Sequence, residues 1–149
     1  MQIQPTEAQL QAVTRLESAI HLQSGALAEK AVSEAFAVGL HPLYAQYLIF
    51  LAEVPWHSRH EDVVLALQRL RSPAAVGALE RTAHAVHAYL AYDDGLALAR
   101  KCTWALADIG TPEAHQALVR LSNCENAIIA GFARKRLNNW QRELKRKGL

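Results

Sequence analysis

Apolar and polar residues recur along this chain with the three- to four-residue spacing of amphipathic helices. One such face, at about 100° per residue, follows Pro73: Val76, Leu79, Ala83, Val86 and Leu90. No alternating pattern of a β-strand competes with this spacing. The pattern therefore predicts an all-α chain of eight helices, at residues 6–22, 26–39, 42–53, 58–70, 73–92, 95–109, 112–122 and 126–146.

An internal repeat with an offset of 39 residues orders these helices. The segment LALQRLRSPAAVGAL, residues 65–79, aligns with WALADIGTPEAHQAL, residues 104–118, and the two share eight identical or closely similar positions. A fainter copy, EAFAVGLHPLYAQYL, occupies residues 34–48. In every copy an apolar helical stretch ends, a short turn follows and a proline opens the next helix. Each unit is thus expected to be a helix, a tight turn and a second helix.

The residues at the turn explain why a new helix begins there. Proline lacks a backbone N–H, and the first helical position is one where that N–H would have no partner. Pro42, Pro73 and Pro112 hold this position. Ser72 and Thr111 come immediately before a proline, and their hydroxyl oxygens are predicted to accept hydrogen bonds from free N–H groups of the first turn.

Four helical hairpins in series, none able to bury its apolar face alone, are typical of an α-solenoid. We expect a single domain over residues 1–149, a length that suits one domain. Within it we expect a repeat core at about residues 40–122 and a capping helix at about 126–146.

The stretch ARKCTWALADIGTPEAHQALVRL, residues 99–121, resembles the HEAT-repeat (armadillo-like) family, especially small bacterial members. A fair resemblance extends over residues 65–83. The resemblance implies a right-handed α-α superhelix of about four antiparallel pairs, whose second helices line a concave binding surface. HEAT-like proteins are mostly scaffolds, adaptors and inhibitors, with a few enzymes such as DNA glycosylases and lyases acting on bilins.

Composition favours helices and an intracellular setting. Apolar residues make up 51% of the chain but aromatic ones only 7%, and unbranched apolar side chains lose little rotamer freedom in a helix. There is no apolar run of membrane-spanning length, and MQIQPTEAQL lacks the features of a secretory signal. We expect a cytoplasmic protein, with Cys102 and Cys124 as free thiols.

Charge is distributed unevenly. Residues 134–149 carry seven basic residues and one acid, whereas residues 1–133 carry nine basic and thirteen acidic residues. An acidic body with a basic tail permits contacts between the tail and nucleic-acid phosphates, and the alternative is a solvated cap. The candidate phosphate-binding residues are Arg134, Lys135, Arg136, Arg142, Lys145, Arg146 and Lys147.

The segment WHSRHED, residues 56–62, is the densest in polar chemistry. Stacked repeats place the starts of successive second helices side by side, so this segment is predicted to lie near the end of HAVHAYLAYDDG, residues 84–95. A mixed patch of aromatic, basic and acidic residues is typical of a protein-interaction hot spot; its alternative is helix capping and corner packing. Its expected members are Trp56, His57, Arg59, His60, Glu61, Asp62, Tyr92, Asp93, Asp94, Arg100 and Lys101.

Two chemical alternatives receive less weight. Glu80, His84 and His87 share a strip of the predicted helix and form a weak candidate metal site, but zinc ligands usually come from more than one element. His57 or His60 with Asp93 or Asp94 would make an oriented acid or base, yet no nucleophile, phosphate loop or ligand trio accompanies them. We therefore expect no metal, no cofactor and no catalysis.

These patterns favour a non-catalytic module that binds another protein through a polar concave face. A more specific hypothesis is a bacterial immunity protein that neutralises a partner toxin, because an acidic body suits the capture of a basic nuclease. The alternatives are a nucleic-acid binder that uses the basic tail and a metal-dependent or acid/base enzyme. No contact with a membrane is expected.

Overall fold

The structure is a computed structural model that describes residues 3–148; within that range it contains helices joined by turns and loops, and no strand. This confirms the predicted all-α class. The helices are α1 (Glu7–Leu22), α2 (Gly25–Ala37), α3 (Ala45–Glu53), α4 (His60–Leu70), α5 (Val76–Thr82), α6 (Leu96–Ile109), α7 (Pro112–Ser122), α8 (Ala127–Asn138) and α9 (Trp140–Arg146), with 3₁₀ turns η1 (Pro42–Tyr44), η2 (Pro73–Ala75) and η3 (Ala88–Asp93).

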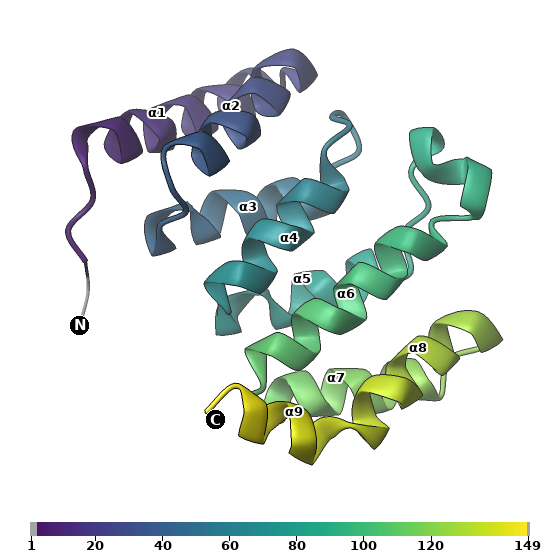
Figure 1. Cartoon of the computed structure of the whole chain (residues 1–149). Helices are drawn as coiled ribbons and strands as arrows, with labels where there is room; N and C mark the ends of the chain where they lie inside the picture. Colours follow the sequence, from purple (N-terminus) through teal and green to yellow (C-terminus); the bar gives the residue numbers. More distant parts are fainter. Residues whose placement is uncertain (1–2, 149) are drawn as a thin grey trace.

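The helices pack in sequential pairs, α1 with α2, α3 with α4, α5 with α6 and α7 with α8. Across the pairs, α3 packs on α5 and α5 on α7, while α4 packs on α6 and α6 on α8. Two layers result, and Figure 1 shows one behind the other. We call α1, α3, α5 and α7 the first-helix layer, and α2, α4, α6 and α8 the second-helix layer. The arrangement is that of a HEAT-like α-solenoid.

Helix starts follow the local chemistry of the sequence. The Thr6 hydroxyl accepts a hydrogen bond from the Gln9 N–H, and the Gln9 Oε1 accepts one from the Thr6 N–H, which makes a reciprocal capping box. Thr111 caps α7 by accepting from the Ala114 N–H, as predicted. The side chain of Ser72 makes no capping bond, in contrast to the prediction. The chain after Pro73 starts as a 3₁₀ turn instead, in which the Ser72 carbonyl accepts from the Ala75 N–H.

The turn of the repeat has a conserved backbone shape. Arg71 and Gly110, which are 39 residues apart, both adopt the left-handed conformation, with φ of 47° and 70°. Each ends the helix before it, α4 or α6. The left-handed residue stops the helix so that the next can turn back.

Leucine and alanine fill a continuous core between the two layers. Alanine on the facing helices lets their backbones approach, and leucine fills the space between them. Completely buried leucines come from both layers: Leu16, Leu48, Leu67, Leu79, Leu98, Leu106, Leu118 and Leu121. Gly25 at the start of α2 lies against the loop that precedes α4. A Cβ at this position would be 2.5 Å from the Trp56 carbonyl oxygen, so only glycine fits.

The predicted helix at 73–92 is wrong. Helix α5 ends at Thr82, an irregular stretch follows, and η3 forms a separate turn. In this broken arrangement both His87 and Leu90 are buried. The returning chain passes close to Gly95, where a Cβ would lie 2.9 Å from the Ala85 carbonyl oxygen and φ is +72°.

The predicted capping helix at 126–146 is also divided. Helix α8 ends at Asn138 and α9 begins at Trp140. The bend at Asn139 turns α9 against α6, and it buries Trp140 and Glu143. Within residues 3–148, none of the helices has the length and apolar character needed to cross a membrane.

Candidate functional site

A groove of about 280 Å³ lies where the start of α4 meets η3. Both segments belong to the stretches that the sequence singled out, and the fold brings them together. We call this site the α4–η3 groove. Its lining residues are Ser58, Arg59, Glu61, Asp62, Tyr89, Leu90 and Tyr92.

Tyr89 joins the two walls of the groove. Its hydroxyl donates to His60 Nδ1 at 2.8 Å and accepts from the His60 backbone N–H at 2.9 Å. Tyr89 was not among the predicted patch residues, because a continuous helix over residues 73–92 gave no reason to place its side chain against α4. The available signal in the sequence was Tyr89, two residues after His87 in an apolar run. The break after Thr82 is what brings its side chain to α4.

Three histidine rings are stacked beneath the groove. The centroids of His57 and His60 are 3.9 Å apart, and those of His60 and His87 are 3.6 Å apart. His57 Nε2 donates to the Leu51 carbonyl at 2.6 Å, and His60 Nε2 donates to the Val54 carbonyl at 2.6 Å. The stack therefore fixes the end of α3, the start of α4 and the segment before η3.

Burial disfavours the charged form of these imidazoles. It lowers the pKa of all three histidines, and the pKa of His60 falls to about 4 because a cation loses its hydration in such a site. His57 and His60 are 3% and 0% exposed. Their predicted place in the partner-binding patch is corrected: they lie beneath it and support its shape.

Charged residues at the rim of the groove neutralise one another. Arg59 binds Asp62 at 2.8 Å and donates to the Ser33 hydroxyl at 2.6 Å. Lys101 of α6 binds Glu61 of α4 at 2.9 Å. Four predicted patch residues are thus adjacent in the structure, and they form two ion pairs that leave this rim without excess charge.

The remaining predicted patch residues have different positions. Tyr92 is 79% exposed beside the groove. Asp93 caps α6 by accepting from the Gly95 and Ala97 N–H groups, both at 3.0 Å. Asp94 is exposed with φ of 57°, and Trp56 lies half-buried edge-on against His57. Arg100 is exposed and has no ion pair within residues 3–148.

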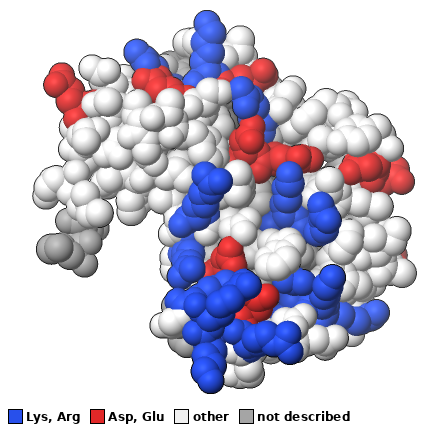
Figure 2. All heavy atoms as spheres, in the orientation of Figure 1, with Lys and Arg blue, Asp and Glu red and all other residues white. Residues whose placement is uncertain are grey.

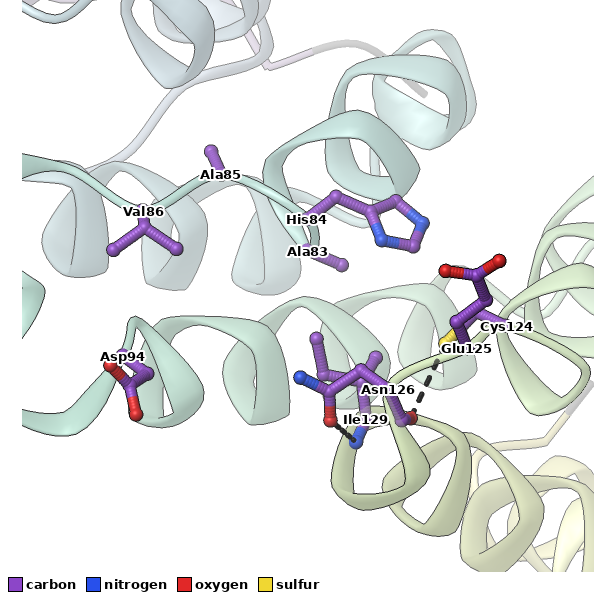
Figure 3. A pocket seen from close by; sticks show the side chains of 9 residues that line it. All are labelled: Ala83, His84, Ala85, Val86, Asp94, Cys124, Glu125, Asn126 and Ile129. Atoms are coloured by element: carbon purple, nitrogen blue, oxygen red, sulfur yellow. Dashed lines mark hydrogen bonds between the residues drawn. The ribbon is translucent and has the colours of Figure 1, made fainter.

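The weak candidate metal site does not assemble. Glu80 pairs with Arg120, His87 lies in the histidine stack, and His84 lines a different pocket of about 350 Å³. Figure 3 shows His84, Asp94 and Glu125 spread around that pocket without converging. No group of three His, Cys, Asp or Glu residues in the described part of the chain could hold a metal ion.

The alternative of a histidine–aspartate acid/base pair is likewise not formed. Both ring nitrogens of His57 are engaged, with the Leu51 carbonyl and with the Arg59 N–H at 3.0 Å. Both nitrogens of His60 are engaged as well, while Asp93 is committed to capping α6. Neither histidine presents a nitrogen to a substrate in this arrangement.

Much of the basic tail turns inward. The Arg136 guanidinium lies 3.5 Å above the Trp104 ring and is buried next to Glu143, and burial lowers its pKa. Lys147 binds Asp108 at 2.6 Å, and Arg146 binds Glu143 at 2.6 Å. The exposed members of the predicted phosphate-binding set include Arg134, whose guanidinium donates to the Ser122 carbonyl, together with Lys135, Arg142 and Lys145.

Charge is arranged differently on the two layers. In the first-helix layer Arg81 of α5 binds Glu53 of α3 at 2.6 Å, and Arg120 of α7 binds Glu80 of α5 at 2.8 Å. Arg81 and Arg120 are 39 residues apart and occupy equivalent positions of the repeat, whereas their partners Glu53 and Glu80 do not. Figure 2 shows Lys and Arg gathered over the lower half of the second-helix face, where Figure 1 places α6, α8 and α9, with acidic atoms between them.

Residues 98–124 match the family of PBS lyase HEAT-like repeats. The matched segment comprises nearly all of α6 and the whole of α7 with the turn between them, which is the helix–turn–helix unit expected from the sequence. No curated protein and no solved structure matches the chain.

Proposed function

We propose that this HEAT-repeat protein binds another protein, with the α4–η3 groove as the contact site. HEAT-like repeat domains are typically protein-interaction modules, which supports the general class. The single observation that carries the site is Tyr92, an aromatic ring 79% exposed beside a groove. Large exposed aromatic rings are favoured anchors of protein interfaces, because they bury much area at little entropic cost.

Rigidity beneath the groove strengthens this proposal. Tyr89 and the histidine stack hold the two walls in fixed positions by hydrogen bonds of 2.6–2.9 Å. A preformed site loses less entropy when a partner binds. Neutralised charges at the rim, such as the pair between Lys101 and Glu61, limit the cost of removing water from them.

The narrower hypothesis of a bacterial immunity protein that captures a basic toxin receives less support. Capture of a basic partner needs free carboxylates, and half of the fourteen acidic residues are already in ion pairs. These are Glu34, Glu53, Glu61, Asp62, Glu80, Asp108 and Glu143. Nucleic-acid binding by the tail is weakened in the same way, since Arg136, Arg146 and Lys147 are paired.

The experiment compares two exposed aromatic residues, one beside the groove and one outside its lining. Tyr92→Ala removes the proposed anchor, and Phe50→Ala removes a ring on α3 that is 47% exposed and does not line the groove. We expect affinity capture from the source cell to recover one stoichiometric protein with the wild type and with Phe50→Ala, and to lose it with Tyr92→Ala. Recovery of no stoichiometric protein, or equal loss in both variants, would contradict the proposal.

A further inference from the structure

We infer that the partner presents an acidic polypeptide segment, which lies along the second-helix layer from the α4–η3 groove toward α9. The inference rests on the proposed function and adds the chemistry of the partner. We call this surface the basic face. The helices of this surface and their ends carry exposed cations without a carboxylate partner in residues 3–148: Lys30, Arg69, Arg71, Arg100, Arg134, Lys135, Arg142 and Lys145.

Contacts between helices define the extent of the basic face. Lys101 of α6 reaches Glu61 of α4, and Gln68 of α4 donates to Asp108 of α6 at 2.7 Å. Arg69 of α4 lies 5.7 Å over the Phe36 ring of α2. At the other end, Arg136 of α8 covers Trp104 of α6, and Lys147 beyond α9 binds Asp108. The positions around 69, 101, 104 and 108 therefore share one surface that runs over α2, α4, α6, α8 and α9.

The acidic residues of this surface are already occupied. Glu61 is bound by Lys101, Asp108 by Lys147, and Glu143 by Arg136, Arg146 and Lys147. These three carboxylates therefore offset the four cations bound to them almost completely. The unpaired arginines add positive charge to this balance, so the surface attracts carboxylates or phosphates. In contrast, the arginines of the first-helix layer have partners.

Carboxylates on a polypeptide fit this surface better than a continuous phosphate chain. Carboxylates are interspersed among these cations: Glu61 and Asp62 stay partly exposed at the groove although each has a cation partner, and the Asp108 side chain is 20% exposed farther along. A nucleic acid would bring a phosphate near these carboxylates at regular intervals. A polypeptide can place acidic residues at Arg69 and Arg100, and neutral residues opposite Glu61. The charge pattern therefore favours a protein segment.

Aromatic rings add apolar contacts along the same path. Trp104 is partly exposed on α6, and Arg136 fixes the ring from one side. Tyr92 marks the groove end. The 14 residues of α6 extend over about 21 Å at 1.5 Å per residue, which about six residues of extended polypeptide match. A short linear acidic motif is thus long enough to contact Arg100 and Trp104 together.

The test measures binding of the full chain to a defined probe by fluorescence anisotropy. The probe is a fluorescein-labelled decapeptide of alternating Glu and Ala, and the comparison probes are a Lys/Ala decapeptide and a single-stranded oligothymidine of ten nucleotides. We expect the acidic peptide to bind best, and to bind more weakly as salt rises from about 50 to about 200 mM. Tighter binding of the oligonucleotide, or no binding of the acidic peptide at the lower salt, would overturn the inference.

Matched variants assign the binding to the basic face. The double substitution Arg69→Gln with Arg100→Gln should weaken the acidic peptide about tenfold, as expected for the loss of two ion contacts. Arg81→Gln with Arg120→Gln removes the same charge from the first-helix layer, where the two arginines have 66% and 59% exposed side chains. This control should bind nearly as well as the wild type. Equal weakening in both double variants would show nonspecific attraction and overturn the inference.

Capture of the natural partner separates this inference from the proposed function. If a partner depends on Tyr92 but binds equally well to the Arg69/Arg100 variant, the proposed function holds and the inference is wrong. If the acidic peptide binds through both arginines but Tyr92→Ala captures the partner as well as the wild type does, the groove proposal is wrong and the basic face is retained. All variants change exposed residues, and circular dichroism will verify that they fold.

Discussion

The two layers of this solenoid share a core but treat their surface charges differently. In the first-helix layer Arg81 and Arg120, at equivalent positions of the 39-residue repeat, each bind a carboxylate on the preceding helix of the same layer. In the second-helix layer Arg69, Arg71 and Arg100 are exposed without such partners in the described part of the chain. An exposed ion pair contributes little stability, so neither layer needs these pairs to fold. The difference indicates that the second-helix layer is the surface available to a partner protein.

A core leucine from either layer provides the most severe test of the shared core. Leu79→Ala in α5 and Leu106→Ala in α6 each remove a completely buried side chain. Each should lower the free energy of unfolding by about 2–5 kcal/mol, measured by urea denaturation. Leu43, which is 42% exposed, is the control, and Leu43→Ala should change the free energy of unfolding only a little. A large cost in one layer alone would mean that the layers do not form one cooperative core.

Glu143→Ala tests a strongly buried charge network that joins α9 to the second-helix layer. Glu143 and Arg136 have side chains only 11% and 6% exposed, so the substitution leaves Arg136 buried with reduced compensation. We expect a loss of up to about 3 kcal/mol, together with detachment of α9 seen as faster amide exchange. Glu113→Ala, an exposed acidic residue in the first turn of α7, serves as the control.

Acid should loosen the junction between α4 and η3. The pKa of His60 is about 4 in the folded protein, below its ordinary value near 6.5, so the unfolded chain binds the proton more tightly. Stability is therefore retained above pH 6.5 and is lost as pH falls from there toward 4. His57 and His87, whose pKa values are also lowered, act in the same direction.

Thermal unfolding between pH 7 and pH 4 measures this effect. The wild type and His84→Gln, which changes an exposed histidine, should show the same decrease in Tm. His60→Gln should show a shallower decrease from a lower starting Tm. Parallel curves for all three proteins would exclude a role for the stack in acid sensitivity.

The smallest effect is expected from the ion pairs of the first-helix layer. Arg81→Gln removes the pair with Glu53, whose members are 66% and 36% exposed, and should cost less than about 1 kcal/mol. It should leave binding of the acidic decapeptide unchanged. If Arg81→Gln weakened that peptide as much as the Arg69/Arg100 double variant, the two layers would not differ in the way proposed.

Sequence periodicity predicted most of the fold for a clear reason. Apolar spacing and the proline at each repeat turn act over a few residues, so α1 to α4 and α6 and α7 begin and end within a few residues of their predicted positions. The prediction was wrong where contacts between residues distant in the sequence determine where a helix ends. The apolar spacing continues from Val76 to Leu90, but the chain breaks after Thr82 because folding back buries His87 and Leu90. The bend at Asn139 has the same cause, the burial of Trp140 and Glu143.

The candidate functional site was also predicted only in part. The sequence placed WHSRHED beside the end of HAVHAYLAYDDG, and the structure brings residues 58–62 next to Tyr89 and Tyr92. The sequence did not distinguish buried histidines from exposed ones. A helical wheel describes a single helix, whereas His57, His60 and His87 are buried by contacts with other segments. The sequence prediction also counted Arg136 and Lys147 as free charges, since their partners Glu143 and Asp108 are identified only by the packing of α9.

By itself the sequence determined the all-α class, the repeat and its turns, because these depend on local spacing, capping and backbone preferences. Only the tertiary structure decided which polar residues face a partner. Burial and ion pairing depend on neighbours that are distant in the chain, such as Lys101 with Glu61 and Arg136 with Trp104. The charges that remain free after those contacts form, on the second-helix layer, are the ones that we assign to binding.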